Sequence, residues 1–175
     1  RTFSALFNKS CSLSQQQHEL AEEAEELQRL GESLSAGSPG MGVFIISSNS
    51  ADLLDCFVYE NEAFIELMNG SRKETPWRMV HESSIPEMQQ AIVALYRIKK
   101  EREGLGPDEP EPVSTKPIRM VTRTGEDLHA MCSTSIHTSF LGNDFFVTRC
   151  EPIGVEERSS EGGGAAAVRE SKPGK

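Results

Sequence analysis

The stretch that decides the fold is Gly42–Phe64, GVFIISSNSADLLDCFVYENEAF. Its apolar, β-branched start (MGVFIISS, residues 41–48) is typical of a buried strand, and SNSADLLD is a polar connection. CFVYENEAF predicts a second strand that runs directly into a helix over 62–68. Asn61 is suited to cap that helix, because its side chain can accept a hydrogen bond from an exposed amide at the helix start.

A second helix is predicted from Ser84, where Ser-Ile-Pro-Glu forms a capping box with proline in the first turn. Apolar residues then follow at three- and four-residue spacing, and they give this helix one apolar face: Ile85, Met88, Ala91, Ile92 and Leu95. The next segment, 101–117, is charged and proline-rich, and we expect a flexible loop insertion there.

Three strands are predicted after this loop, over 118–123, 128–138 and 145–153. Along 128–138, apolar residues alternate with polar ones such as His129 and His137, which is typical of a strand with one wet face. Strands at both ends with helices between them predict an α+β fold, with one antiparallel sheet and helices on one face. Residues 155–175 are predicted to be a disordered tail.

Residues 1–36 are rich in helix-forming residues and predict an amphipathic N-terminal helix. Leucine recurs every seven residues, the spacing of a coiled-coil contact: Leu6, Leu13, Leu20, Leu27 and Leu34. The companion positions include Ala24 and Gly31 and are poor for a zipper. Two interpretations stay open, a helix that pairs with another chain and a helix that lies on its own sheet. The predicted dimer interface is Leu13, Leu20, Leu27 and Leu34.

The region 40–154 resembles a PAS domain. YENEAFIELMNG resembles the family's N-x-A-F…G segment through Asn61, Ala63, Phe64 and Gly70. MVHESSIPEM is similar to its V-H-P-x-D segment, and RMVTRTGEDLHAMCS to its strand-turn-strand. The resemblance implies a five-stranded sheet, a pocket between the sheet and the central helices, and dimerisation, often through a helix just before the first strand.

A small apolar ligand is one use of such a pocket, and a packed core without any ligand is the alternative. The residues expected to enclose the pocket are Phe44, Ile46, Phe64, Met68, Ile92, Met120, Ile136 and Phe146. We expect no flavin adduct, because the family's reactive-cysteine signature is absent from this sequence. We also expect no haem, since His81, His129 and His137 have more ordinary structural or solvent-facing interpretations. No metal site is predicted.

The net charge of −9, from 18 basic and 27 acidic residues, argues against direct contact with nucleic acid or with an anionic membrane surface. Its many acidic residues are interpreted as a solvated surface. The four cysteines lack zinc-finger or CxxC spacing, and we expect them to be reduced in an intracellular protein, cytoplasmic or nuclear. The chain starts with Arg, and we expect it to be a piece of a longer protein.

No nucleophile, phosphate-loop or metalloprotease motif appears in the sequence, so we expect no enzymatic activity. The sequence therefore favours a PAS-type regulatory and dimerisation module of an intracellular signalling or transcription protein, which forms a homodimer or heterodimer through its N-terminal helix and sheet. The alternative is a sensor domain whose apolar pocket binds a ligand and controls an attached effector.

Overall fold

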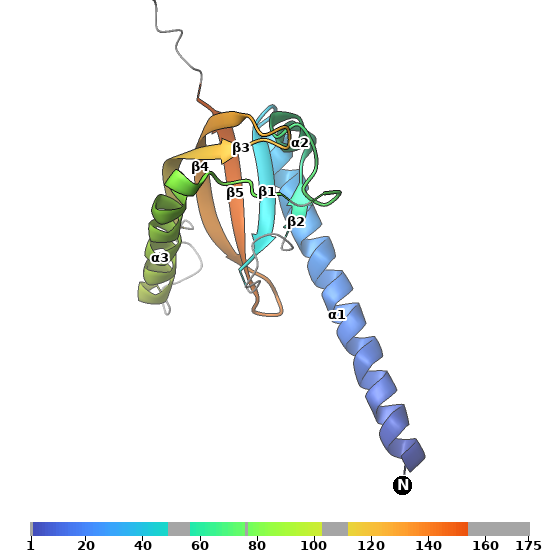
Figure 1. Cartoon of the computed structure of the whole chain (residues 1–175). Helices are drawn as coiled ribbons and strands as arrows, with labels where there is room; N and C mark the ends of the chain where they lie inside the picture. Colours follow the sequence, from blue (N-terminus) through green and yellow to red (C-terminus); the bar gives the residue numbers. More distant parts are fainter. Residues whose placement is uncertain (1, 49–56, 76, 103–111, 154–175) are drawn as a thin grey trace, which may run out of the picture.

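The computed structural model describes residues 2–48, 57–75, 77–102 and 112–153, and it has the predicted α+β architecture. A long helix comes first, followed by two strands, short helical segments, a second long helix and three strands (Figure 1). The bounds are α1 (Thr2–Gly37), β1 (Gly42–Ser47), β2 (Phe57–Glu60), α2 (Glu62–Leu67), a 3₁₀ turn (Glu82–Ser84), α3 (Ile85–Glu101), β3 (Val113–Val121), β4 (Asp127–Thr138) and β5 (Asp144–Pro152).

The strands form one five-stranded antiparallel sheet in the order β2-β1-β5-β4-β3. The last strand, β5, therefore lies in the middle of the sheet, and the first strand, β1, lies between β5 and the edge strand β2. This pairing of distant segments confirms the α+β, five-stranded antiparallel sheet that the resemblance to PAS domains implied.

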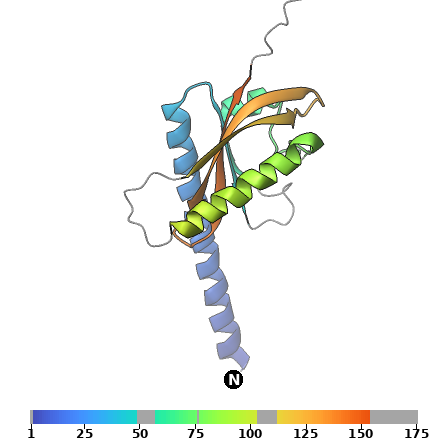
Figure 2. The ribbon, with the colours of Figure 1, turned by 90° about the vertical axis from the view of Figure 1, so that its left-hand side faces the viewer.

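The helices lie on both faces of this sheet. Figure 2 shows α3 in front of the sheet and α1 behind it. We call the face toward α2 and α3 the inner face and the face toward α1 the outer face. The prediction of helices on one face holds for α2 and α3. The N-terminal helix packs on the other side, because the alternating residues of β1 and β5 are apolar on both faces.

The inner face carries the larger core. Phe64 and Met68 of α2 are completely buried there, beside Phe44 of β1 and Met120 of β3. The rings of Phe44 and Phe64 lie 4.7 Å apart, centre to centre, and Phe57 of β2 completes an aromatic group. This group forms part of the inner core.

The outer face has a second core under α1. Val43 and Ile45 of β1 point to this side, and Phe145 and Val147 of β5 lie next to them. Leu27 of α1 covers them and is only 1% exposed. Burial of a leucine of this kind contributes about 1.5–3 kcal/mol. The outer core fixes the C-terminal half of α1 on the sheet, while the N-terminal half extends beyond the sheet (Figure 1).

The two predicted helix caps have different outcomes. Asn61 caps α2 as predicted, since its Oδ1 accepts a hydrogen bond from the backbone N–H of Phe64 at 2.9 Å. The prediction of a capping box at Ser84 is wrong, because the Ser84 side chain makes no capping hydrogen bond to α3. The 3₁₀ turn before α3 gives Ser84 a helical backbone, and its hydroxyl accepts a hydrogen bond from the N–H of Arg119 instead.

The loop predicted over 101–117 is partly wrong. Strand β3 begins at Val113 and pairs with β4 from that residue onward, and Glu101 still belongs to α3. Pro117 does not interrupt β3, because an edge strand leaves one side of its backbone without a ladder partner. Residues 103–111 of this loop and the predicted tail at 155–175 lie outside the described residues.

Candidate functional site: a cavity under α3

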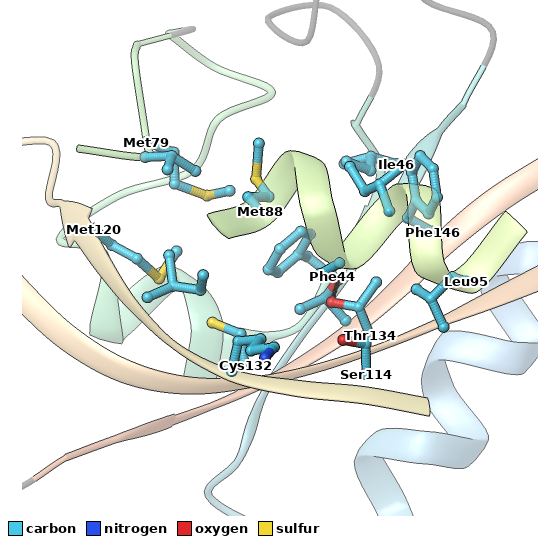
Figure 3. Close-up of a pocket in the computed structure, with 16 residues that line it drawn as sticks. Phe44, Ile46, Met79, Met88, Leu95, Ser114, Met120, Cys132, Thr134 and Phe146 are labelled. Atoms are coloured by element: carbon cyan, nitrogen blue, oxygen red, sulfur yellow. Dashed lines mark hydrogen bonds between the residues drawn. The ribbon is translucent and has the colours of Figure 1, made fainter. Parts of the chain in front are cut away.

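A cavity of about 70 Å³ lies between α3 and the inner face of the sheet (Figure 3). All the strands except β2 contribute to its lining, together with α3 and the segment before it. The lining residues are Phe44, Ile46, Met79, Val80, Met88, Ala91, Ile92, Leu95, Ser114, Lys116, Ile118, Met120, Cys132, Thr134, Phe146 and Thr148.

The size of the cavity limits what it can hold. A cavity of about 150 Å³ is large enough to bind benzene, and a single water needs about 10–15 Å³ on the same kind of measure. The present cavity of about 70 Å³ therefore accommodates molecules no larger than a few waters. A ring-sized ligand requires α3 or the side chains around it to move.

Methionines make such movement easy at one end of the cavity. In Figure 3, Met79, Met88 and Met120 lie toward one end, and Leu95, Ile46 and Phe146 lie toward the other. Methionine is unbranched and adapts its shape to its surroundings at small cost. The methionine end is thus the side at which the cavity can enlarge.

A row of hydroxyl groups crosses the mostly apolar floor of the cavity, to which Lys116 of β3 also contributes. Ser114 pairs with Thr134 and Thr134 with Thr148, so the three hydroxyls lie side by side on β3, β4 and β5. The Oγ1 atoms of Thr134 and Thr148 are 3.0 Å apart. A ligand with a carbonyl, hydroxyl or amide group could exchange hydrogen bonds with this row while its apolar part contacts the surrounding side chains.

Two cysteines lie next to this row. Cys132 lines the cavity, and Cys150 lies directly opposite it on β5, completely buried. Their sulfur atoms are 3.1 Å apart, and both are free thiols. The hydrogen bond with Cys132, together with burial, raises the pKa of the Cys150 thiol well above its ordinary value.

Of the predicted pocket residues, the structure places Phe44, Ile46, Ile92, Met120 and Phe146 around the cavity. It does not place Phe64, Met68 or Ile136 there. Phe64 and Met68 are completely buried in the inner core beside the cavity, and Ile136 packs with Leu95 and Phe146.

Sequence reasoning missed most of the polar lining. The hydroxyls of Ser114, Thr134 and Thr148 follow from strand register, which pairs residues far apart in the chain. The composition of 101–117 predicts a loop there, and this prediction conceals that Ser114 belongs to a strand. A signal was available in the alternation from Ser114 to Met120, which places Ser114, Lys116, Ile118 and Met120 on one face.

The contact of α1 with the outer face includes one buried and one half-buried carboxylate. The carboxylate of Glu23 is 6% exposed and accepts hydrogen bonds from the hydroxyl of Ser139 and from the side-chain amide of Asn143, the latter at 2.9 Å. Glu26 lies 2.9 Å from Nε2 of His137. The interpretation of the acidic residues as a solvated surface is wrong at Glu23, because this carboxylate joins α1 to the β4–β5 turn.

The predicted dimer leucines have different environments. Leu27 is buried against the sheet, and Leu34 packs on the same outer core. In this structure neither is available to a partner, because the apolar outer face of β1 and β5 takes them. Leu20 is 57% exposed, and the side chain of Leu13 lies outside the described residues.

Asn61 joins three elements at the C-terminal end of α1. Its Oδ1 accepts hydrogen bonds from the N–H of Phe64 and from the N–H of Val43, and its Nδ2 donates to the carbonyl of Met41 and the hydroxyl of Ser35. One side chain thus connects the end of α1, the start of β1 and the start of α2.

The histidines considered for haem have protein partners or are exposed. Nδ1 of His81 lies 2.8 Å from the Ser83 hydroxyl, His137 contacts Glu26, and His129 is exposed. Among the described residues, no group of three or more His, Cys, Asp or Glu side chains is arranged to hold a metal ion.

None of the helices in the described part of the chain combines the length and the apolar character needed to cross a membrane.

Comparisons with known proteins yield matches of shape. No family model matches this chain, and no curated protein matches it. A PAS domain of a two-component sensor histidine kinase is 13% identical, with 74% of this chain and 99% of that chain covered and a TM-score of 0.46. A fungal LOV-domain photoreceptor is 16% identical, with 65% and 74% covered and a TM-score of 0.46.

A third match is a sensory box histidine kinase/response regulator domain from Geobacter sulfurreducens, which is 16% identical. The match covers 69% of the present chain and 92% of the Geobacter sulfurreducens domain, with a TM-score of 0.41. At these identities and scores, the matches assign no ligand, signal or activity to this chain.

Proposed function

We propose that this chain is a non-catalytic regulatory module of an intracellular signalling or transcription protein. In this proposal the state of the cavity under α3 is transmitted through the sheet to α1. The helix then passes the change to whatever segment or partner contacts its projecting half.

The observation that carries this proposal is the alternation along β1 and β5. Phe44 and Phe146 point into the cavity, and their chain neighbours Val43 and Phe145 support α1 on the opposite face. Successive residues of a strand point to opposite faces, so both contacts depend on the position of the same backbone. A ligand that displaces this backbone also disturbs the surface on which Leu27 packs.

A filling substitution in the cavity tests this coupling without a known ligand. Ala91 of α3 lines the cavity, and Ala94 on the same helix is exposed. We expect Ala91→Leu to change the hydrogen exchange of α1 over residues 20–37, and the matched control Ala94→Leu to leave it unchanged. If Ala91→Leu alters exchange in α3 and the inner strands while α1 keeps its normal rates, the proposed coupling is wrong.

Bound molecules are tested on the purified chain by native mass spectrometry and visible absorption. An added mass of defined size would support the sensor form of this function, and a flavin or haem would also absorb visible light. A polypeptide mass alone, with no thermal shift from small apolar or planar compounds, would favour a module that acts through protein contacts.

Pairing through α1 is a second candidate function, favoured by the exposure of Leu20 and by the projection of the N-terminal half of α1 beyond the sheet. We expect Leu20→Asp to leave the fold intact and to abolish a dimer seen in native mass spectra, because a charge would replace an apolar contact. Gln28→Asp is the matched control, because it places the same charge at an exposed position of the half of α1 that lies on the sheet. We expect this control to leave the dimer unchanged. A Leu20→Asp protein that remains dimeric contradicts pairing through this part of α1.

A further inference from the structure

The cysteine pair beside the cavity has a geometry that none of the functions above requires. Cys132 and Cys150 are directly opposed on neighbouring antiparallel strands, and both point to the inner face. Their sulfur atoms are 3.1 Å apart without a bond between them. A disulfide has a length of about 2.05 Å, so a movement of about 1 Å would bring the two sulfurs to bonding distance.

The two thiols differ in their access to small molecules. Cys132 is 7% exposed and lines the cavity, whereas Cys150 is 0% exposed. Reaction with a reagent in the cavity must therefore begin at Cys132. Because the cavity of about 70 Å³ holds only a few water-sized molecules, a hydroperoxide such as hydrogen peroxide fits into it, and a bulky disulfide does not.

We propose that Cys132 and Cys150 are a modification site, at which a small hydroperoxide entering the cavity forms a reversible disulfide between β4 and β5. This inference rests on the cavity and the sulfur pair. It is independent of the proposed coupling to α1.

The reaction is balanced in two steps. The thiolate of Cys132 attacks one peroxide oxygen, the O–O bond breaks, and Cys132 becomes a sulfenic acid while hydroxide leaves and takes up the proton that Cys132 released. The sulfur of Cys150 then attacks the sulfur of Cys132, the S–O bond breaks, and water leaves with the proton of Cys150. Two thiols are oxidised to one disulfide, and one hydrogen peroxide is reduced to two waters.

The bond would alter the floor of the cavity. Cys132 and Cys150 lie two residues from Thr134 and Thr148 on the same strands. Drawing the two sulfurs together therefore shifts β4 and β5 directly beside the hydroxyls of Thr134 and Thr148. A thiol would also be lost from the cavity lining. The disulfide is therefore expected to change which small molecules the cavity accepts.

The test treats the folded full chain with hydrogen peroxide, blocks remaining thiols after denaturation, and digests the protein with trypsin. Arg149 lies between the two cysteines, so trypsin separates them unless they are bonded to each other. We expect a linked peptide pair containing Cys132 and Cys150, which dithiothreitol separates again.

Variants identify the order of events. In Cys150→Ala we expect a sulfenic acid at Cys132, trapped by dimedone, and in Cys132→Ala we expect an unmodified Cys150. Circular dichroism verifies the fold, and Cys150→Val replaces Cys150→Ala if the latter is unfolded. The proposal is overturned if the peroxide-treated chain keeps both thiols, if Cys132 proceeds to higher oxides while Cys150 stays free, or if either residue is linked to Cys11 or Cys56 instead.

Discussion

The two long helices contact the same sheet in different ways. On the outer face, α1 approaches so closely that a Cβ at Gly31 would lie 2.4 Å from the ring of Tyr59, and its Glu23 carboxylate is buried under the β4–β5 turn. On the inner face, α3 leaves a cavity lined partly by methionines. A close-packed contact transmits displacement, whereas a loosely packed one accommodates it. The contact of α3 with the inner face can therefore accommodate a bound molecule, and the contact of α1 with the outer face can transmit the resulting displacement of the sheet.

The largest expected difference between the two contacts comes from matched truncations. Leu27→Ala removes a side chain that is 1% exposed in the outer core and should cost about 2–5 kcal/mol in the free energy of unfolding. Ile92→Ala borders an existing cavity and loses fewer contacts, so its cost should be smaller. Chemical denaturation of both variants measures the two costs. Equal costs would mean that the inner contact is packed as tightly as the outer one.

Asn61 provides a test of the junction between α1, β1 and α2. Asn61→Ala leaves the N–H groups of Val43 and Phe64 without their acceptor and should cost about 1–3 kcal/mol. Asn61→Asp keeps this acceptor, although it replaces the two donor bonds to Met41 and Ser35 with an oxygen that faces the Met41 carbonyl, and its loss should be smaller because both N–H groups stay paired. Thermal unfolding compares the two variants. If the aspartate variant is as unstable as the alanine variant, the main contribution of Asn61 to stability comes from its Nδ2 side, which contacts Met41 and Ser35.

Gly31 tests how close the outer contact is. Gly31→Ala gains about 1 kcal/mol of helix propensity but forces a methyl group against Tyr59, which costs about 1–3 kcal/mol by overpacking. We therefore expect a net loss of stability in the native sequence and a gain in a Tyr59→Ala background. Gly37→Ala is the matched control, since nothing lies within 4 Å of its Cβ position. A stabilising Gly31→Ala in the native sequence would show that α1 can move off Tyr59 at little cost.

The smallest expected effect concerns the C-terminal end of α3. Burial raises the pKa of Asp144, but bonds from Lys99 and Thr138 outweigh it, and the pKa lies below its ordinary value in the folded protein. A lowered folded pKa favours the folded state above the unfolded pKa, and this contribution disappears as the pH falls through the folded pKa.

Asp144→Asn should therefore cost stability at neutral pH and lose this deficit in acid. The expected difference is about 1 kcal/mol at neutral pH, the upper end of the range for ion pairs open to solvent, because this pair is partly buried. Denaturation of Asp144→Asn and the native chain across the acidic range measures it. A deficit that stays constant with pH would assign the effect to packing and not to the charge.

Local signals in the sequence were sufficient for several features. Asn61 caps α2, the apolar face of α3 points to the sheet, and β4 has one apolar and one polar side, as predicted. Each depends on residues within a few positions of one another. The interpretation of His81 as structural is also confirmed, because its ring bonds Ser83 two residues away.

Features that depend on distant residues were not predictable in this way. Gly31 counted as a defect in a leucine repeat, yet in the structure it permits contact with Tyr59. The acidic composition of α1 predicts that Glu23 is solvated, but its partners Ser139 and Asn143 lie more than a hundred residues further along the chain. Three of the predicted pocket residues lie in closed core, since apolar character alone does not distinguish a cavity wall from a packed interior.

The sequence by itself determined the order of helices and strands, the apolar and polar sides of β4, and the α+β class, because short-range periodicity encodes these properties. Only the tertiary structure decided that α1 packs opposite α3, that three hydroxyls form one row, and that Cys132 meets Cys150. These pairings arise from strand register and from the need to cover both apolar faces of β1 and β5. Both are properties of the whole sheet, and no single segment carries them.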